Sequence, residues 1–439
     1  MWSYSLLSIL TGAALALWTL SAALNEKVFA VHVTCWGAPA LLLLAVLIWI
    51  FVQGSTAVPE GWHHPVWSQV RSTLDDPTIR GAISLNPDGT PVMLARIGTY
   101  AAVFWLAMQY GRSSNSAHVI FWAIALSGML YATYGIWAYL SGSGKILFAD
   151  KWAYQYSLTS TFVNRNHYAV FAGMGLITSF GMAIRYLKRD ASGAFDSSRR
   201  FLNSMENLSL PVFILTGICV VTGSALLLTQ SRGGVFFSAG ALVTLVLLLQ
   251  AGGTLRKRSS LALVGALAVL GAAMFAISGG GFTERFSGKL LKSDRELIHS
   301  VALDAIADAP LTGHGAGSFP SLFHLYRDAE FPAISPAFAA AHSVYLEFAA
   351  ETGLIAAALY FGMLLLIVVR CFIGARNRRR NQLYPAVGGA VAVLIGLHSY
   401  FDFGPQTPGV AVTFAALLGV AFAQAWPTNG RRTNQSGDK

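Results

Sequence analysis

Charged residues and cysteines are both scarce in this sequence, and each shortage excludes a class of protein. Only 11% of the 439 residues are charged, whereas 54% are hydrophobic. A soluble domain carries about 25% charged residues, so a soluble globular chain is excluded. The three cysteines, Cys35, Cys219 and Cys371, all lie in apolar runs, so neither a disulfide framework nor a thiolate metal site is expected. The composition predicts an all-α, polytopic membrane protein.

The long apolar runs predict about eleven transmembrane helices, because roughly 20 apolar residues are needed to cross a 30 Å hydrocarbon layer. The predicted spans are 4–24, 28–52, 92–111, 117–140, 166–186, 210–230, 233–251, 260–278, 342–369, 383–401 and 406–426. We expect one membrane domain over residues 1–426. The polar residues 279–341 form a large loop with short helices, and residues 427–439 form a basic, disordered, cytoplasmic tail.

The basic residues are distributed unevenly between the two sides of these spans. Alternating the loops places 18 of the 30 Lys and Arg residues on one side, while most acidic residues fall on the other. Short basic loops face the cytoplasm, so segments 53–91, 141–165 and 279–341 are predicted to face outward. Membrane topology thereby accounts for the net charge of +10, and no nucleic-acid partner is expected.

The loop 279–341 is the longest polar interruption, and it contains a helix start. Ser293 is followed three residues later by Glu296, which is the capping-box pattern. Apolar residues at helical spacing from 297 to 306 predict a short helix that ends before Pro310. Its first turn carries Arg295, where the helix dipole disfavours a cation. Either Arg295 is solvated and paired with a neighbouring acid, or it forms an anion site with the helix N-terminus, suited to a phosphate. The later glycines from 313 to 317 are interpreted as turn glycines, because no strand precedes them.

The predicted topology brings unusual polar residues to one membrane face. They are Arg165, Asn166 and His167 at the fifth span, Arg232 between the sixth and seventh, Arg295 in the loop, His342, Glu347 and Glu351 on the ninth span, and His398 and Asp402 at the end of the tenth. Taken singly, Arg165 or Arg232 is explained by snorkelling to lipid headgroups, and His342 by bonding at a helix end. Glu351 is harder to explain in this way. In a continuous span it lies about 13 Å below His342, where an acid is functional or paired.

Arginine, histidine and carboxylate at an outer membrane face point to a lipid-linked pyrophosphate. Guanidinium groups match a pyrophosphate in charge and geometry. A histidine accepts a proton from a hydroxyl nucleophile near neutral pH. The implied reaction is displacement by a hydroxyl group, with the lipid pyrophosphate leaving. The sequence has no metal-binding motif, so the arginines would stabilise the leaving charge, and we expect neither metal nor cofactor.

At these residues the sequence resembles the superfamily of O-antigen ligases and O-antigen polymerases. The resemblance covers roughly residues 80–425, with a ligase-related core at about 161–402. It rests on the motifs Ile83-Ser84-Leu85-Asn86-Pro87, Thr161-Phe162-Val163-Asn164-Arg165-Asn166-His167, Gln230-Ser231-Arg232-Gly233, Arg295 with Pro310-Leu311-Thr312-Gly313-His314-Gly315, His342-Ser343-Val344-Tyr345-Leu346-Glu347 with Glu351-Thr352-Gly353, and His398-Ser399-Tyr400-Phe401-Asp402.

The resemblance implies an enzyme that takes an undecaprenyl-pyrophosphate-linked glycan at the periplasmic face of the bacterial inner membrane, without metal or nucleotide sugar. It implies that Arg232 and Arg295 hold the pyrophosphate and that His342 activates the acceptor hydroxyl. The remaining polar residues of that face are expected to bind substrate. Family members have about twelve spans, so twelve is the alternative to eleven here.

The expected function is therefore that of a membrane glycosyltransferase of the O-antigen ligase type, which acts on a glycan or lipid acceptor in lipopolysaccharide or other cell-surface polysaccharide assembly. The first alternative is an O-antigen or exopolysaccharide polymerase, which shares donor and motifs with a ligase. A small-anion transporter of the bicarbonate type would need polar groups near the bilayer midplane. A lipid-linked glycan flippase would need a cationic cavity that reaches the cytoplasmic side. The crowding of polar groups at one face favours an enzyme.

Overall fold

The computed structural model describes residues 2–25, 30–190, 209–278, 294–327 and 340–427. Side chains are described in these ranges except at residues 2–3, 270–278 and 294–295. The predicted tail 427–439 lies outside the described residues, apart from Pro427.

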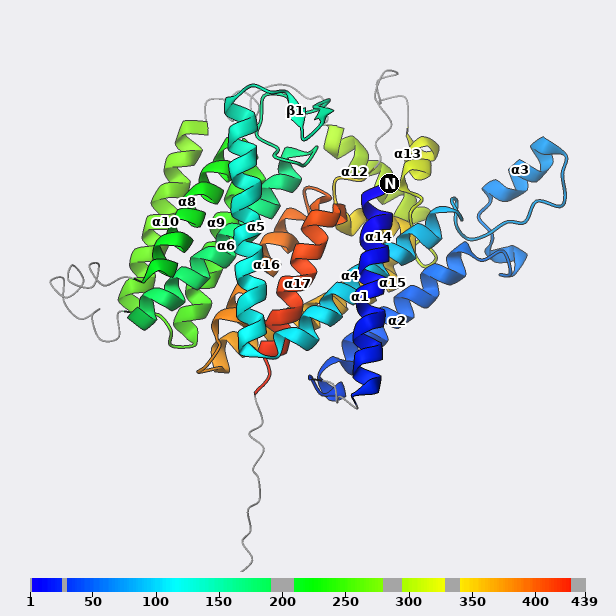
Figure 1. The fold of residues 1–439 in the computed structure, drawn as a ribbon. Coiled ribbons are helices and arrows are strands. Elements are labelled where there is room, and N and C mark those ends of the chain that lie inside the picture. The colour runs from blue at the N-terminus through cyan, green and yellow to red at the C-terminus, as the bar shows by residue number, and fades with distance from the viewer. Residues whose placement is uncertain (1, 26–29, 191–208, 279–293, 328–339, 428–439) are drawn as a thin grey trace, which may run out of the picture.

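The described chain is almost entirely helical (Figure 1). Its α-helices are α1 (Trp2–Leu24), α2 (Val33–Gly54), α3 (Val66–Leu74), α4 (Gly89–Gly111), α5 (Ser114–Leu140), α6 (Arg165–Asp190), α8 (Leu210–Leu228), α9 (Arg232–Ala251), α10 (Lys257–Ser278), α12 (Asp294–Asp308), α13 (Phe319–Tyr326), α14 (Val344–Thr352), α15 (Leu354–Asn377), α16 (Leu383–His398) and α17 (Pro408–Gln424). Two 3-10 helices, η1 (Glu60–Trp62) and η4 (Gly404–Gln406), lie in connecting segments. One antiparallel hairpin pairs β1 (Lys145–Ile146) with β2 (Ala149–Asp150), in the register Lys145 opposite Asp150.

The predicted polytopic membrane fold is confirmed. Within the described residues, eight helices (α1, α2, α4, α5, α6, α8, α9 and α15) are long and apolar enough to cross a membrane. The 22-residue α10 and the shorter apolar helices α16 and α17 occupy the positions of the other predicted spans. Large apolar side chains such as Leu17 on α1 and Val119 on α5 are exposed, with fractions of 68% and 66%. Such exposure is expected of side chains that face lipid.

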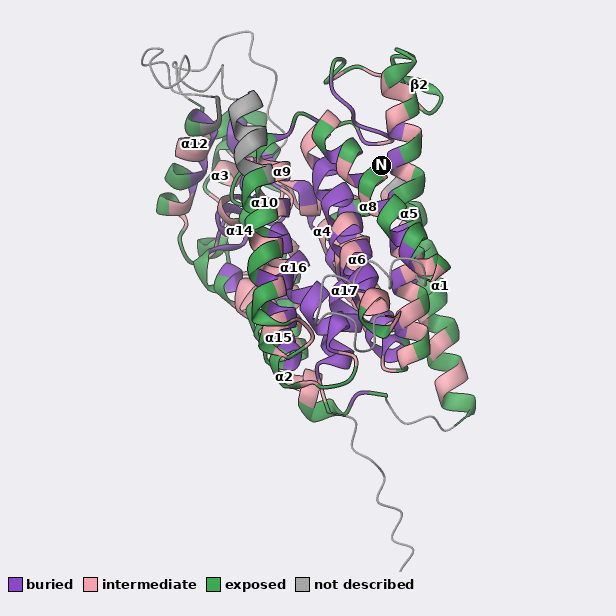
Figure 2. Cartoon of the chain, turned by 90° about the vertical axis from the view of Figure 1, so that its left-hand side faces the viewer, coloured by how far each residue is buried: buried purple, intermediate pink, exposed green. Residues whose placement is uncertain are grey.

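Helix α6 forms the centre of the bundle. It packs against α5, α8, α9, α16 and α17, and 72% of its membrane window is buried within the protein. Figure 2 shows buried residues concentrated on α6, α16 and α17, while the outward sides of α1 and α5 are exposed. Because α6 is surrounded by protein, polar groups at its first turn face other helices rather than lipid. This burial allows Asn166 and His167 to take part in an internal site.

The segments that connect the helices at one end of the bundle form a polar cap, which is uppermost in Figure 1. We call this the His342 end. The backbone N–H of Leu85 donates to the carbonyl of His314 at 2.8 Å, which joins segment 53–91 to segment 294–327. The N–H of Leu158 donates to the carbonyl of Leu228 at 3.1 Å, which attaches segment 141–165 to the end of α8. The predicted gathering of these three segments at one end is therefore observed.

The predicted loop helix is confirmed as α12, which ends at Asp308, shortly before Pro310. Its apolar residues, predicted from their spacing, form a small core with α13 and α14. That core contains Leu297, Ile298, Val301, Ala302 and Ala305 with Phe319, Leu322, Phe323, Ala341 and Ala350. The three glycines 313, 315 and 317 all have positive φ, as expected of turn glycines.

The predicted continuous span 342–369 is wrong, because Gly353 divides it into α14 and α15. Gly353 has a φ of 82°, and a Cβ added there would lie 2.2 Å from the carbonyl oxygen of Leu311. A residue with a side chain therefore does not fit this conformation. The nine-residue α14 packs against α12 and α13, and only α15 is long enough to cross a membrane. Glu351 consequently does not lie deep on a spanning helix.

Candidate active site

His342 lies in a tight turn just before α14. Its φ is +53°, a left-handed conformation that is uncommon for a residue with a side chain. Ser343 follows as the N-cap of α14, and its hydroxyl accepts from the N–H of Leu346. The N–H of Val344 donates to the carbonyl of Ser399 at 2.9 Å, which fixes the turn against the end of α16. The hydrogen bonds of the two residues that follow His342 therefore hold its unusual backbone conformation, and such conformations cluster at functional sites.

The carboxylate of Asp402 is the centre of the polar cluster beside His342. It is 1% exposed and lies in the connection between α16 and α17. Its Oδ1 is 3.8 Å from Nδ1 of His342 and 3.3 Å from Nε2 of His167. Its Oδ2 accepts from Nδ2 of Asn166 at 2.5 Å, and Oδ1 also accepts from the N–H of Phe403 at 2.8 Å. Four predicted site residues, from three separate parts of the chain, thus meet at one carboxylate.

Asn166 extends this cluster to the start of α9. Its Oδ1 accepts from the hydroxyl of Ser231 at 2.8 Å, and the same hydroxyl caps α9 by accepting from the N–H of Gly234. A Cβ at Gly234 would lie 2.5 Å from Cβ of Ala169 on α6, so the glycine allows the two helix ends to approach. Arg232 is the first residue of α9 and its side chain is exposed. The structure therefore places Arg232 at a helix N-terminus, where the dipole also favours an anion.

Two aromatic rings define the position of the histidines. The ring of Phe403 makes edge contacts with His167, at 4.6 Å between centroids, and with His342, at 5.0 Å. Nδ1 of His167 is 2.7 Å from the hydroxyl of Thr407. When Nε2 of His167 donates to Asp402, Nδ1 is the acceptor for this hydroxyl. His398 is buried at the end of α16, with its ring 6.1 Å from that of Phe237.

The electrostatics keep Asp402 ionised. Burial by itself would raise the pKa of Asp402, but the hydrogen bond from His167, the electrostatic influence of His167 and His398 and the hydrogen bond from the N–H of Phe403 outweigh it. The pKa of Asp402 therefore lies well below its ordinary value. A buried carboxylate that stays charged stabilises a positive charge on a neighbouring imidazole. His342 is the partly exposed neighbour of this carboxylate, with 20% of its side chain accessible.

Arg165 and Arg295 are not joined to this carboxylate. The guanidinium of Arg165 donates to the hydroxyl of Ser157 at 3.1 Å and lies over the ring of Tyr154. It therefore faces segment 141–165 rather than Asp402. The backbone of Arg295 lies in the first turn of α12, as predicted, but its side chain is outside the described residues.

Glu347 and Glu351 are buried in the cap and bound to its backbone. Glu347 accepts from the N–H of Ala341 at 2.8 Å through Oε2 and from Nε2 of Gln406 at 2.7 Å through Oε1. Glu351 accepts from the N–H of Phe319 at 2.9 Å. Burial raises the pKa of both carboxyls, and repulsion by Glu351 raises that of Glu347 further. The two acids position the segments on either side of the site, and Glu347 binds both the residue before His342 and the connection that carries Asp402.

Sequence reasoning did not select Ser231, Phe403 or Thr407 as site residues. Ser231 stands beside Arg232 and has the sequence signal of an N-cap, so it was the easiest of the three to recognise. Phe403 directly follows Asp402, but an aromatic residue at the end of a predicted span has no distinguishing signal. Thr407 gains its role only because the α16–α17 connection folds back over α6. The roles of Phe403 and Thr407 depend on tertiary contacts that no local pattern records.

The arrangement is suited to taking a proton from a hydroxyl group. A partly exposed histidine lies beside a buried carboxylate whose other bonds fix its position. In histidine-dependent catalysis, such a carboxylate orients the imidazole and stabilises it once protonated. The adjacent N-terminus of α9, with Arg232, provides positive potential for an anionic leaving group.

Comparison with known proteins confirms the resemblance. Residues 217–361 match the family model described as O-antigen ligase, and over these residues the chain carries an O-antigen ligase-related domain. It is a multi-pass membrane protein that carries this O-antigen ligase-related domain. The matched region contains Arg232, Arg295 and His342, whereas Asn166, His167 and Asp402 lie outside it. A search of curated proteins finds no match, and nothing in the comparisons supports the transporter alternative.

Proposed function

We propose that this protein is a glycosyltransferase of the bacterial inner membrane that moves an undecaprenyl-pyrophosphate-linked glycan to a hydroxyl acceptor at the periplasmic face. The observation that carries the proposal is the contact of His342 with the buried carboxylate of Asp402, 3.8 Å apart, at the end of the bundle where α9 begins with Arg232. The family match supports the lipid-linked glycan as donor.

In the proposed reaction, His342 is the general base. The acceptor oxygen attacks the anomeric carbon of the glycan and forms the new glycosidic bond, while His342 takes its proton. The bond between the anomeric carbon and the pyrophosphate oxygen breaks, and the electron pair leaves with undecaprenyl pyrophosphate. Arg232 and Arg295 bind the pyrophosphate and stabilise its charge. Asp402 stabilises the imidazolium until the proton is released to water.

The substrate-binding roles of the other predicted residues are divided by their contacts. Asn166, His167 and His398 hold Asp402 in place, so we assign them to positioning. Arg165, on the side of segment 141–165, is assigned to the glycan or pyrophosphate portion of the donor. Glu347 and Glu351 shape the cap around His342 and do not contact the sugar.

A direct test uses the His342→Ala variant in membranes supplied with a lipid-linked glycan. We expect transfer to fall by at least 100-fold, while the donor still binds, because its pyrophosphate is held by the arginines. Loss of donor binding together with transfer would contradict the base assignment and make His342 a phosphate contact.

The ligase form of the proposal is tested in a strain that lacks the protein. We expect long polymer to remain on undecaprenyl pyrophosphate, with none on the final acceptor. Accumulation of single repeat units would instead identify a polymerase, which uses a second lipid-linked glycan as its acceptor.

A further inference from the structure

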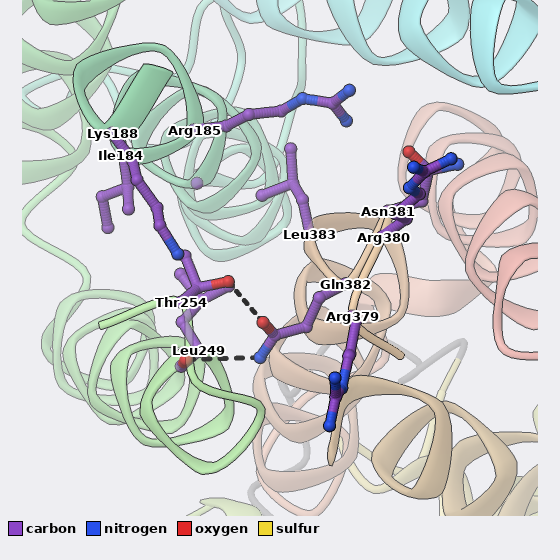
Figure 3. Close-up of a pocket in the computed structure, with 11 residues that line it drawn as sticks. Ile184, Arg185, Lys188, Leu249, Thr254, Arg379, Arg380, Asn381, Gln382 and Leu383 are labelled. Carbon is purple, nitrogen blue, oxygen red and sulfur yellow. Dashed lines mark hydrogen bonds between the residues drawn. The ribbon is translucent and has the colours of Figure 1, made fainter. Parts of the chain in front are cut away.

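A second polar cluster lies at the opposite end of the bundle, far from His342. There the last turns of α6, the end of α9 and the start of α16 enclose a cavity of about 380 Å³. Figure 3 shows side chains that reach it from α6 and from the connection between α15 and α16, with Gln382 between them. None of these residues belongs to the candidate active site.

The cavity has a preformed floor. Ile184, Leu249, Gln382 and Leu383 are buried beneath it. Nε2 of Gln382 donates to the carbonyl of Leu248 at 2.8 Å, and the hydroxyl of Thr254 donates to its Oε1. These bonds join α9 to the start of α16 and are drawn in part in Figure 3. Buried and hydrogen-bonded residues therefore fix the position of the cavity floor.

Four cations surround this floor, and no acid balances them. Arg185 and Lys188 lie three residues apart on one face of α6, while Arg379 and Arg380 come from the α15–α16 connection. The residues that line the cavity include no Asp or Glu. No ion pair with a carboxylate is found for any of the four cations in the part of the chain that the structure describes. Four like charges around one cavity repel each other unless an anion lies between them.

The start of α16 adds to the positive potential. This 16-residue helix begins at Leu383 in the cavity wall and has no acidic residue in its first turn. Its dipole therefore presents partial positive charge to the cavity. Guanidinium groups beside a helix N-terminus match the charge and the oxygen geometry of a phosphate group.

Neighbouring aromatic residues indicate the level of the membrane interface. Tyr186, next to Arg185, has its ring 6.3 Å from that of Trp122, and its hydroxyl is 2.8 Å from Nε2 of His118. Trp and Tyr are enriched where lipid headgroups meet the hydrocarbon layer. Arg185 lies five residues before the end of α6, which is about 8 Å along the helix axis. The cavity is thus at headgroup depth, where a phosphate carried by a lipid arrives from the side.

We propose that this cavity binds the phosphate group of an anionic phospholipid from the leaflet at this end of the protein. Lys188, Arg379 and Arg380 contact the phosphate oxygens at the rim. Arg185, which also lies over the ring of Tyr384, contacts the inner side of the headgroup. The lipid joins α6, α9 and α16 at the end opposite the active site.

The test measures lipid retention by the full-length protein in mixed detergent micelles that contain phosphatidylglycerol and phosphatidylcholine. Bound lipid is identified by native mass spectrometry. We expect wild-type protein to retain phosphatidylglycerol preferentially. The double variant Lys188→Gln/Arg380→Gln should weaken this binding roughly thirtyfold, since each cation near a membrane surface contributes about a factor of five. Both side chains are exposed, so the variant is expected to fold.

The matched control is Arg376→Gln/Lys257→Gln, which removes two exposed positive charges from the same end of the bundle but none from the cavity lining. It should change the affinity by less than threefold. An equal loss of phosphatidylglycerol affinity in both double variants would show that general surface charge accounts for the binding, and it would refute the proposed site. Absence of a preference for phosphatidylglycerol in the wild type would also overturn it. Displacement of the lipid by micromolar glycerol phosphate or inorganic phosphate would identify a soluble phosphate as the ligand and refute the lipid assignment.

Discussion

The charge of Asp402 is predicted to act through His342, and Asp402→Asn removes that charge with little change in shape. In the structure, Oδ1 of Asp402 is 3.8 Å from Nδ1 of His342. At an effective dielectric constant of about 20, two unit charges at this distance attract by about 4 kcal/mol. If His342 becomes protonated as the acceptor hydroxyl is activated, the loss of this attraction raises the barrier by a similar amount. This increase of the barrier corresponds to roughly a thousandfold slower transfer.

A double-mutant cycle separates this role from structural damage. Transfer of lipid-linked glycan is measured for Asp402→Asn, for His342→Ala and for the double variant, at equal amounts of inserted protein. If Asp402 acts through His342, the double variant is no slower than His342→Ala alone. Additive losses, or transfer by Asp402→Asn near the wild-type rate, would refute the reasoning. Donor binding should persist in all three variants, because the pyrophosphate contacts are assigned to arginines.

Three further predictions address the anion site, the topology and the cap. Arg232→Ala should abolish transfer without preventing membrane insertion. Arg232→Lys should retain only part of the transfer activity, because lysine lacks the bidentate fork of arginine. Wild-type turnover by Arg232→Ala would mean that Arg232 only contacts lipid headgroups. Ser321 and Asn377 are both exposed. In a background without native cysteines, an impermeant maleimide added from outside should label Ser321→Cys but should not label Asn377→Cys. The reverse pattern would invert the proposed orientation. Burial, followed by the charge of His314, lowers the pKa of His64 to about 4, so the folded cap favours neutral His64. Below pH 6.5 the unfolded chain binds a proton at this histidine more readily than the folded cap does. Stability against proteolysis should therefore be complete above pH 6.5 and fall between pH 6.5 and 4. A His64→Gln variant should lose part of that pH dependence, and an unchanged slope would contradict this assignment.

Much of the fold could be predicted because its signals are local. Apolar run lengths predicted the positions and approximate limits of most of the long helices, and the capping pattern with helical spacing predicted α12. The gathering of polar segments at one end followed from alternating the loops across the membrane. These inferences depend on the cost of exposing backbone and charge to lipid, which every spanning segment meets in the same way.

The parts that could not be predicted depend on contacts between distant residues. The break at Gly353 was missed because the glycine lies inside an apolar run, and only the approach of Leu311 requires its conformation. Glu347 and Glu351 were expected on a spanning helix, whereas the structure places them on the short α14 and binds both to backbone groups of the cap. Their contact with substrate stays a prediction. Asn166 was predicted for the site, but its role in joining Ser231 to Asp402 requires three segments to meet.

The hydrogen bonds of Glu347 couple the two halves of the candidate site mechanically. One carboxylate oxygen binds the N–H of Ala341, directly before His342, and the other binds Gln406, shortly after Asp402. A displacement of the surrounding cap is therefore transmitted to both the histidine and its carboxylate, which favours a constant distance between them. If the protein acts as proposed, glycans of different length that displace the cap to different extents leave the alignment of His342 and Asp402 unchanged.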